Sequence, residues 1–225
     1  GSLQQAGLHL GEVHTQNPHN AKGNREHPSI MELQEAVLAD NGGSWYQPPS
    51  AVAWSDERRR ARDAFIDDMQ AQGHQPWGFK DPRTLLLLDG WREACPGARY
   101  VGSIRHPMAV AESLHRRSPN LASLDEFVEL WCIYNKKLLE AWQHQPFPLV
   151  DFDLEDNAYQ ASLQRVLAQL DLNQPGLAAW FKQWWRREQP APFFDPALRR
   201  HRRQGREGLP REVASLHRQL KELAS

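Results

Sequence analysis

Residues 98–107 read Ala-Arg-Tyr-Val-Gly-Ser-Ile-Arg-His-Pro and contain the clearest change of local structure in the chain. The β-rich run up to Ile104 predicts a central strand. Pro107 suits the first position of the helix that follows, because its fixed φ matches a helix and its missing N–H would be unpaired there. A strand followed directly by a helix is the repeating unit of an α/β fold.

The same alternation extends to both sides of this stretch. Two further strands are predicted, at 77–80 and 147–152. Helices are predicted, in chain order, at 2–6, 30–38, 55–71, 84–94, 107–116, 123–143, 157–170, 177–187 and 210–224. Strands that alternate with helices of this length indicate a layered α/β fold with a mainly parallel sheet, and we expect one domain over residues 1–225.

The composition is that of an ordinary globular protein. The 225 residues are enough for a domain with a real core, and 40% of them are hydrophobic and 24% charged. With 27 Lys and Arg against 28 Asp and Glu, the net charge of −1 argues against a polyanion as general partner. The longest aliphatic run is residues 85–88, far short of the roughly 20 residues that cross a bilayer, so no membrane partner is expected.

Cysteine and metal-ligand patterns point to neither a disulfide scaffold nor a zinc site. The two cysteines, Cys95 and Cys132, are not part of a CxxC pair or a Cys/His cluster. The N-terminus shows no basic segment followed by an apolar stretch, so no signal peptide is expected. These features favour a cytoplasmic protein with reduced thiols and no metal cofactor.

Polar side chains gather where the predicted strands end. Lys80 follows the strand at 77–80, and Arg105 follows the strand that ends at 104. Ligands of open α/β sheets bind beyond the carboxyl ends of the strands. The helix that begins at Pro107 offers free N–H groups to an anion and carries the Ser113 hydroxyl. An arginine, a helix start and a hydroxyl at one strand end predict a phosphate-binding corner.

The order of these motifs resembles the sulfotransferase family. Lys-Asp-Pro-Arg at 80–83 is followed by a strand, by Arg-x-Pro at 105–107 and by Ser113 eight residues after the arginine. Members of the family transfer a sulfuryl group from PAPS (3′-phosphoadenylyl sulfate) to a hydroxyl or amine and release PAP. The resemblance implies a three-layer αβα fold like that of the P-loop nucleotide hydrolases. It also implies that Arg105 and Ser113 hold the 3′-phosphate and that Lys80 lies by the transferred group.

The resemblance extends to both ends of the chain. Asn-Pro at 17–18 and Gly-Asn-Arg-Glu at 23–26 resemble the loop before the acceptor-side helix, which implies Glu26 as catalytic base. The stretch 194–206 resembles the C-terminal segment of bacterial members and implies that the basic residues Arg202 and Arg203 bind the nucleotide. Asn20 and Arg83 are candidate contacts for a glycan or small-molecule acceptor, although Arg83 could equally pair with an acid.

One part of the family pattern is missing from the printed sequence. The loop that cradles the phosphosulfate is expected immediately before the helix that ends at Gly7, and none of the 14 glycines is followed by Lys. We therefore expect an incomplete donor site in this chain. Two alternatives stay open: a small-molecule kinase of similar fold, and a non-catalytic module that binds a nucleotide or nucleic acid through the basic stretch 199–206. Nucleic acid is disfavoured because that stretch has no interleaved aromatic residues.

Each candidate residue also has a purely structural interpretation. Glu26 would be a surface carboxylate near a helix start, and Lys80 a solvated lysine at a strand end. Arg105 would form a salt bridge to a nearby carboxylate. Ser113 would bond back to a carbonyl one turn earlier in its helix.

Overall fold

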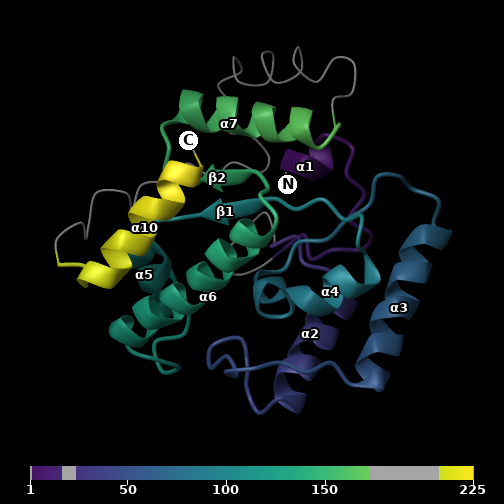
Figure 1. Ribbon diagram of the computed structural model, residues 1–225, viewed down its shortest axis with the longest axis horizontal. Helices are drawn as coiled ribbons and strands as arrows, with labels where there is room; N and C mark the ends of the chain where they lie inside the picture. Colours follow the sequence, from purple (N-terminus) through teal and green to yellow (C-terminus); the bar gives the residue numbers. More distant parts are fainter. Residues whose placement is uncertain (1, 17–23, 173–207, 225) are drawn as a thin grey trace. The chain divides into compact units, whose positions relative to one another are not determined.

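The computed structural model describes residues 2–16, 24–172 and 208–224, and it is a mixed α/β structure with far more helix than strand (Figure 1). Its residues group into two compact units, 1–98 and 99–225, and each is described by itself. The prediction of one domain over the whole chain stays a prediction. Among the described residues, no helix has both the length and the apolar character needed to cross a membrane.

The first unit is mostly helical. Its elements are α1 (Ser2–Gln5), α2 (Pro28–Asp40), α3 (Asp56–Ala71), the 3₁₀ turn η1 (Pro82–Leu86) and α4 (Leu88–Ala94). The predicted strand at 77–80 is reduced to a parallel bridge, in which His9 N donates to Pro76 O and Gly78 N donates to His9 O, both at 2.9 Å. Pro76 and Pro82 flank this segment and lack the N–H groups that a longer ladder needs.

The helix predicted at 84–94 is two elements rather than one. The Asp81 side chain accepts a hydrogen bond from Arg83 N and starts the 3₁₀ turn η1, and Leu87 (φ −120°, ψ 13°) separates it from α4. The other helices of this unit match their predictions closely. Ser55 caps α3 as expected, with its hydroxyl oxygen accepting from Arg58 N at 3.3 Å.

The core of the first unit lies among α2, α3 and α4. Its fully or nearly fully buried side chains include Ile30, Val37, Met69 and Trp91. The Phe79 and Trp91 rings are 4.5 Å apart. This packing fixes Phe79 directly before Lys80, so the start of the Lys-Asp-Pro-Arg loop is anchored in the core.

The second unit contains the strand–helix transition that the sequence predicts. Strands β1 (Gly102–Ile104) and β2 (Leu149–Asp151) lie side by side and parallel, with Gly102 opposite Leu149 and Ile104 opposite Asp151 (Figure 1). Both are shorter than the predicted 98–104 and 147–152. Pro148, which has no N–H, stands directly before β2, and Val101, before β1, is exposed.

The helices of the second unit begin and end within about two residues of their predictions. They are α5 (Pro107–Arg117), α6 (Leu124–His144), α7 (Asp156–Gln169) and α10 (Arg211–Leu223). The capping box expected at the start of α6 is present: Ser123 N donates to Glu126 Oε2 at 2.7 Å, and Ser123 Oγ accepts from Glu126 N at 3.2 Å. The helix predicted at 177–187 lies outside the described residues.

Helix α10 lies against α6 (Figure 1) and has one buried apolar stripe. Val213, Leu216 and Leu220 are buried and follow the spacing of three and four residues that places side chains on one helix face. His217 follows Leu216 on the helix and is therefore next to this buried face. The titratable ring of His217 is therefore half-buried in the second unit.

The close approach of Gly90 to Trp54 provides a test of the first unit's packing. A Cβ at position 90 would collide with the Trp54 indole, whereas a Cβ at Gly97 would meet nothing within 4 Å. We expect Gly90→Ala to lower the free energy of unfolding by about 1–3 kcal/mol, because the overpacking outweighs the better helix propensity of alanine. Urea denaturation of Gly90→Ala and Gly97→Ala measures this. Equal stability of the two variants would contradict the packing described here.

Candidate functional site

Glu26 and Lys80, the two residues predicted to be catalytic, contact each other. They are 54 positions apart in the sequence, yet Lys80 Nζ lies 2.6 Å from Glu26 Oε1. The Glu26 side chain is 10% exposed and the Lys80 side chain 54% exposed. Glu26 is therefore not the surface carboxylate of the structural interpretation, and Lys80 is ion-paired as well as solvated.

The backbone before α2 turns Glu26 inward. Glu26 lies two residues before the helix, and its carbonyl accepts a hydrogen bond from His14 N at 3.0 Å. Arg25 N donates to His14 O at 3.2 Å, and Arg25 adopts a positive φ of 59°. A non-glycine residue in the left-handed region is uncommon and requires support from its surroundings. Here that support is the pairing with His14, which fixes the Glu26 backbone.

Asp81 and Arg83 form a second ion pair directly beside Lys80. The Asp81 side chain is fully buried and accepts from Arg83 N at 2.8 Å and from Arg83 Nη1 at 2.8 and 3.0 Å. Burial raises the pKa of Asp81, the Arg83 guanidinium opposes that shift, and the charge of Glu26 adds to it. Arg83 Nε also donates to Glu35. Arg83 thus pairs with acids, and its contact with an acceptor stays a prediction.

These side chains give the first unit an acid–base site on a fixed loop. The carboxylate of Glu26 can accept a proton, and the ammonium of Lys80 can stabilise a negative charge beside it. Arg83 and Asp81 hold the loop through their mutual hydrogen bonds. The site therefore combines a buried carboxylate with a cation that reaches solvent.

In the second unit, Arg105 and Asp153 follow the ends of the two paired strands. Arg105 follows β1, and Arg105 Nε lies 4.0 Å from Asp153 Oδ1, just beyond β2. The guanidinium lies over the Phe152 ring at 5.2 Å, and Trp131 Nε1 donates to the Arg105 carbonyl at 3.1 Å. The carboxylate interaction foreseen by the structural interpretation is thus present. The side chain is held near the strand ends, as the prediction of a ligand site requires.

Asp153 also occupies the start of α5. Its Oδ2 accepts from His106 N at 2.5 Å, so one free N–H of the predicted anion site is satisfied by a carboxylate. Ser113 lies about two turns further along α5 and is half-buried, and its carbonyl accepts from Arg117 Nε at 3.1 Å. That Arg105 and Ser113 bind one phosphate stays a prediction.

A cluster of ionisable groups surrounds His217 at the same strand ends. The His217 ring contacts His106 edge to face at 5.1 Å and Trp131 at 5.9 Å. The nearby Asp151 is buried, and its Oδ2 lies 3.4 Å from Lys221 Nζ. Burial lowers the pKa of His217 to about 4, and the positive charges of His106 and Lys221 add to this effect. His217 is therefore neutral at pH 7.

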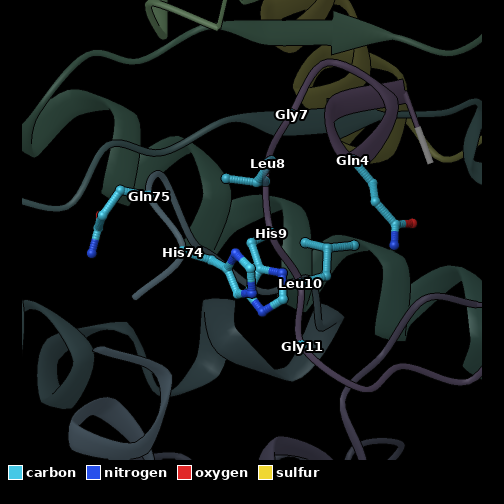
Figure 2. A pocket seen from close by; sticks show the side chains of 8 residues that line it. All are labelled: Gln4, Gly7, Leu8, His9, Leu10, Gly11, His74 and Gln75. Carbon is cyan, nitrogen blue, oxygen red and sulfur yellow. The ribbon is translucent and has the colours of Figure 1, made fainter. Parts of the chain in front are cut away.

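The first unit also has a cleft of about 280 Å³, and of the predicted site residues that the structure describes, none lines it. Figure 2 shows the His9 and His74 rings side by side, with Gln4 and Gln75 on opposite sides of them. The two imidazole centroids are 4.3 Å apart, and His9 Nε2 lies 3.0 Å from Gln72 Oε1. These contacts fix the ring of His9 against its neighbours.

Three predicted site residues, Asn20, Arg202 and Arg203, lie outside the described residues. Within residues 2–16, 24–172 and 208–224, no group of three or more His, Cys, Asp or Glu side chains is arranged to hold a metal ion. No protein-family model, no curated protein and no solved structure matches this chain.

Sequence reasoning missed Asp153 and His217, although each has a signal in the sequence. Asp153 follows the predicted strand at 147–152, where the rule about strand ends applies as it does to Arg105. His217 lies between Leu216 and Leu220 on the amphipathic pattern of the last helix. The sequence does not show which residues contact the His217 ring. The three-dimensional structure places His106 and Trp131 against it.

The lowered pKa of His217 predicts an acid-sensitive second unit. The unfolded state takes up a proton near pH 6.5 and the folded state only near pH 4, so stability is complete above about pH 6.5 and falls as the pH drops toward 4. The free energy of unfolding falls by on the order of 1–2 kcal/mol over this range. The change is this small because the ring is partly open to solvent, which screens its charge. Denaturant unfolding at pH 7 and 4.5, followed in this unit, should show a smaller loss for His217→Gln than for the unmodified chain. The exposed His144, changed to Gln, is the control, and identical pH dependence of all three proteins would contradict the buried, neutral ring.

Proposed function

We propose that this chain is a sulfotransferase-type protein that moves a sulfuryl group from PAPS to a hydroxyl or amine of a glycan or small molecule. The observation that carries the proposal is the 2.6 Å contact between Glu26 and Lys80. Both residues had been assigned from separate motifs, as the base and as the cation beside the transferred group. Their contact is what a shared site requires.

In the proposed reaction, Glu26 receives the proton of the acceptor hydroxyl or amine. The acceptor atom forms a bond to sulfur while the bond between sulfur and the 5′-phosphate oxygen breaks, and the electron pair of that bond leaves with PAP. Lys80 offsets negative charge on the sulfuryl oxygens in the transition state. As in phosphoryl transfer, the acceleration of the reaction comes mainly from positioning the reactants and stabilising charge in the transition state.

Arg105 and Ser113 hold the 3′-phosphate of the nucleotide in this proposal, with Arg202 and Arg203 as further cationic contacts. The position of Arg105 supports this role, because it lies beyond a parallel strand pair where α/β proteins bind anionic ligands. Asp153 keeps the guanidinium near the start of α5. A phosphate would replace that carboxylate as the partner of Arg105.

The proposed fold is the three-layer αβα architecture of the P-loop nucleotide hydrolases. Two parallel contacts support it: the bridge of His9 with Trp77 in the first unit and the pair β1–β2 in the second. Parallel pairing requires crossover connections, usually helices, and α5 and α6 form the connection between β1 and β2.

The role of Arg105 can be tested by nucleotide binding. We expect Arg105→Ala to weaken the binding of PAP about 10- to 100-fold, which corresponds to the ~1.5–3 kcal/mol of a charge-assisted hydrogen bond. Isothermal titration calorimetry measures this directly. Arg99→Ala is the matched control, because Arg99 is an exposed arginine of the same unit that pairs with Asp171 at 2.7 Å. Equal affinities of the two variants for PAP would show that Arg105 does not contact the nucleotide.

The role of Glu26 can be tested by sulfuryl transfer. The assay uses a version of the protein completed with the phosphosulfate-binding loop, PAPS labelled on sulfur and a panel of hydroxyl and amine acceptors. We expect Glu26→Gln in that protein to lower turnover by about 100-fold or more, because the amide does not accept the proton. Binding of PAP should stay within about twofold of that of the unmodified chain. Glu35→Gln is the control, since Glu35 is a neighbouring carboxylate that pairs with Arg83 instead of Lys80. Unchanged turnover of Glu26→Gln would exclude Glu26 as the catalytic base.

A further inference from the structure

We propose that the Lys80–Glu26 ion pair is a latch that donor binding opens. Lys80 leaves Glu26 for the sulfuryl group of PAPS, and only then does Glu26 accept the acceptor's proton. The inference rests on the proposed function, because it concerns the same two side chains. It adds an order of events: the donor binds first, and its binding makes the base available.

The two partners of the latch differ in their freedom to move. The Glu26 side chain is 10% exposed, and its backbone is tied to His14. The Lys80 side chain is 54% exposed, and a lysine ammonium is a compact charge on a flexible stem of four carbons. Opening the pair therefore requires a rotation of Lys80 and no rearrangement of Glu26.

Electrostatics links the departure of Lys80 to the chemistry of Glu26. A carboxylate that is left buried without its cation is strongly unfavourable and gains by taking up a proton. The buried Asp81 adds to this effect, because the charge of Glu26 contributes to the raised pKa of Asp81 and the two carboxylates therefore repel each other. While Lys80 stays, its ammonium occupies Glu26 Oε1 at 2.6 Å.

Arg83, the next cation along the loop, is not placed to take over from Lys80. Its side chain is 14% exposed and is held by both Asp81 and Glu35. The transfer of positive charge from Glu26 to the donor thus depends on Lys80. Without the donor, Glu26 stays paired with Lys80.

A double-mutant cycle on donor affinity tests the latch in the full chain. The probes are PAPS and PAP, which differ only by the sulfuryl group, titrated without an acceptor into the unmodified chain, Glu26→Gln, Lys80→Met and the double variant. We expect Glu26→Gln to raise the affinity for PAPS about 3- to 10-fold, because Lys80 no longer has to leave a carboxylate, while PAP affinity stays within about twofold. In the Lys80→Met background, Glu26→Gln should leave PAPS affinity unchanged within about twofold.

The outcomes separate the latch from the proposed function. If PAP and adenosine 5′-monophosphate bind the unmodified chain equally, the nucleotide site is wrong and both proposals fail. If PAP is preferred but Glu26→Gln changes PAPS and PAP affinity alike, or changes neither, only the latch is overturned. Glu57→Gln removes the same charge from an exposed carboxylate that pairs with Arg58 in the same unit and should leave PAPS affinity unchanged. If Lys80→Met does not fold, the comparison of Glu26→Gln with the unmodified chain on PAPS and PAP still tests the latch, because both proteins keep Lys80.

Discussion

A buried carboxylate needs a cation or an N–H donor, and this constraint organises both units of the structure. Three buried carboxylates each have a cationic partner. The pairs are Asp81 with Arg83, Glu26 with Lys80, and Asp151 with Lys221. Leaving any of these buried carboxylates without its partner is unfavourable, more so than losing an ion pair between two exposed side chains. The loop at 80–83, the segment before α2 and the docking of α10 are therefore each fixed by an acid.

The same constraint explains why the candidate residues lie where a ligand could use them. A loop beyond an extended segment cannot bury its polar groups in a ladder, so its side chains pair with each other or with a ligand. Lys80 and Arg105 both pair with carboxylates in this structure, at 2.6 and 4.0 Å. An anionic nucleotide competes for the same cations, and the exchange of carboxylate for phosphate or sulfuryl oxygen is the common element of the proposed function and of the latch.

The sequence predicts the helices well and the strands poorly, for physical reasons. The caps at Ser55 and Ser123 are local signals, since each hydroxyl meets an N–H three residues later. The extent of a strand depends instead on a distant partner and on which N–H groups are available, so β2 and the bridge at Trp77 come out shorter than predicted beside Pro148 and Pro76. The candidate site follows the same rule: Lys80 and Arg105 were recognisable one by one, whereas the contact with Glu26, the pairing of Arg83 and the positions of Asp153 and His217 are long-range.

The central claim is that the chain has a nucleotide site that recognises a 3′-phosphate. Its most direct test is calorimetric titration of the unmodified chain with PAP and, in parallel, with adenosine 5′-monophosphate, which lacks that phosphate. The account predicts that PAP binds at least about tenfold more tightly, the contribution expected of one charge-assisted contact with arginine. Equal affinity for the two nucleotides, or binding of neither, would contradict it.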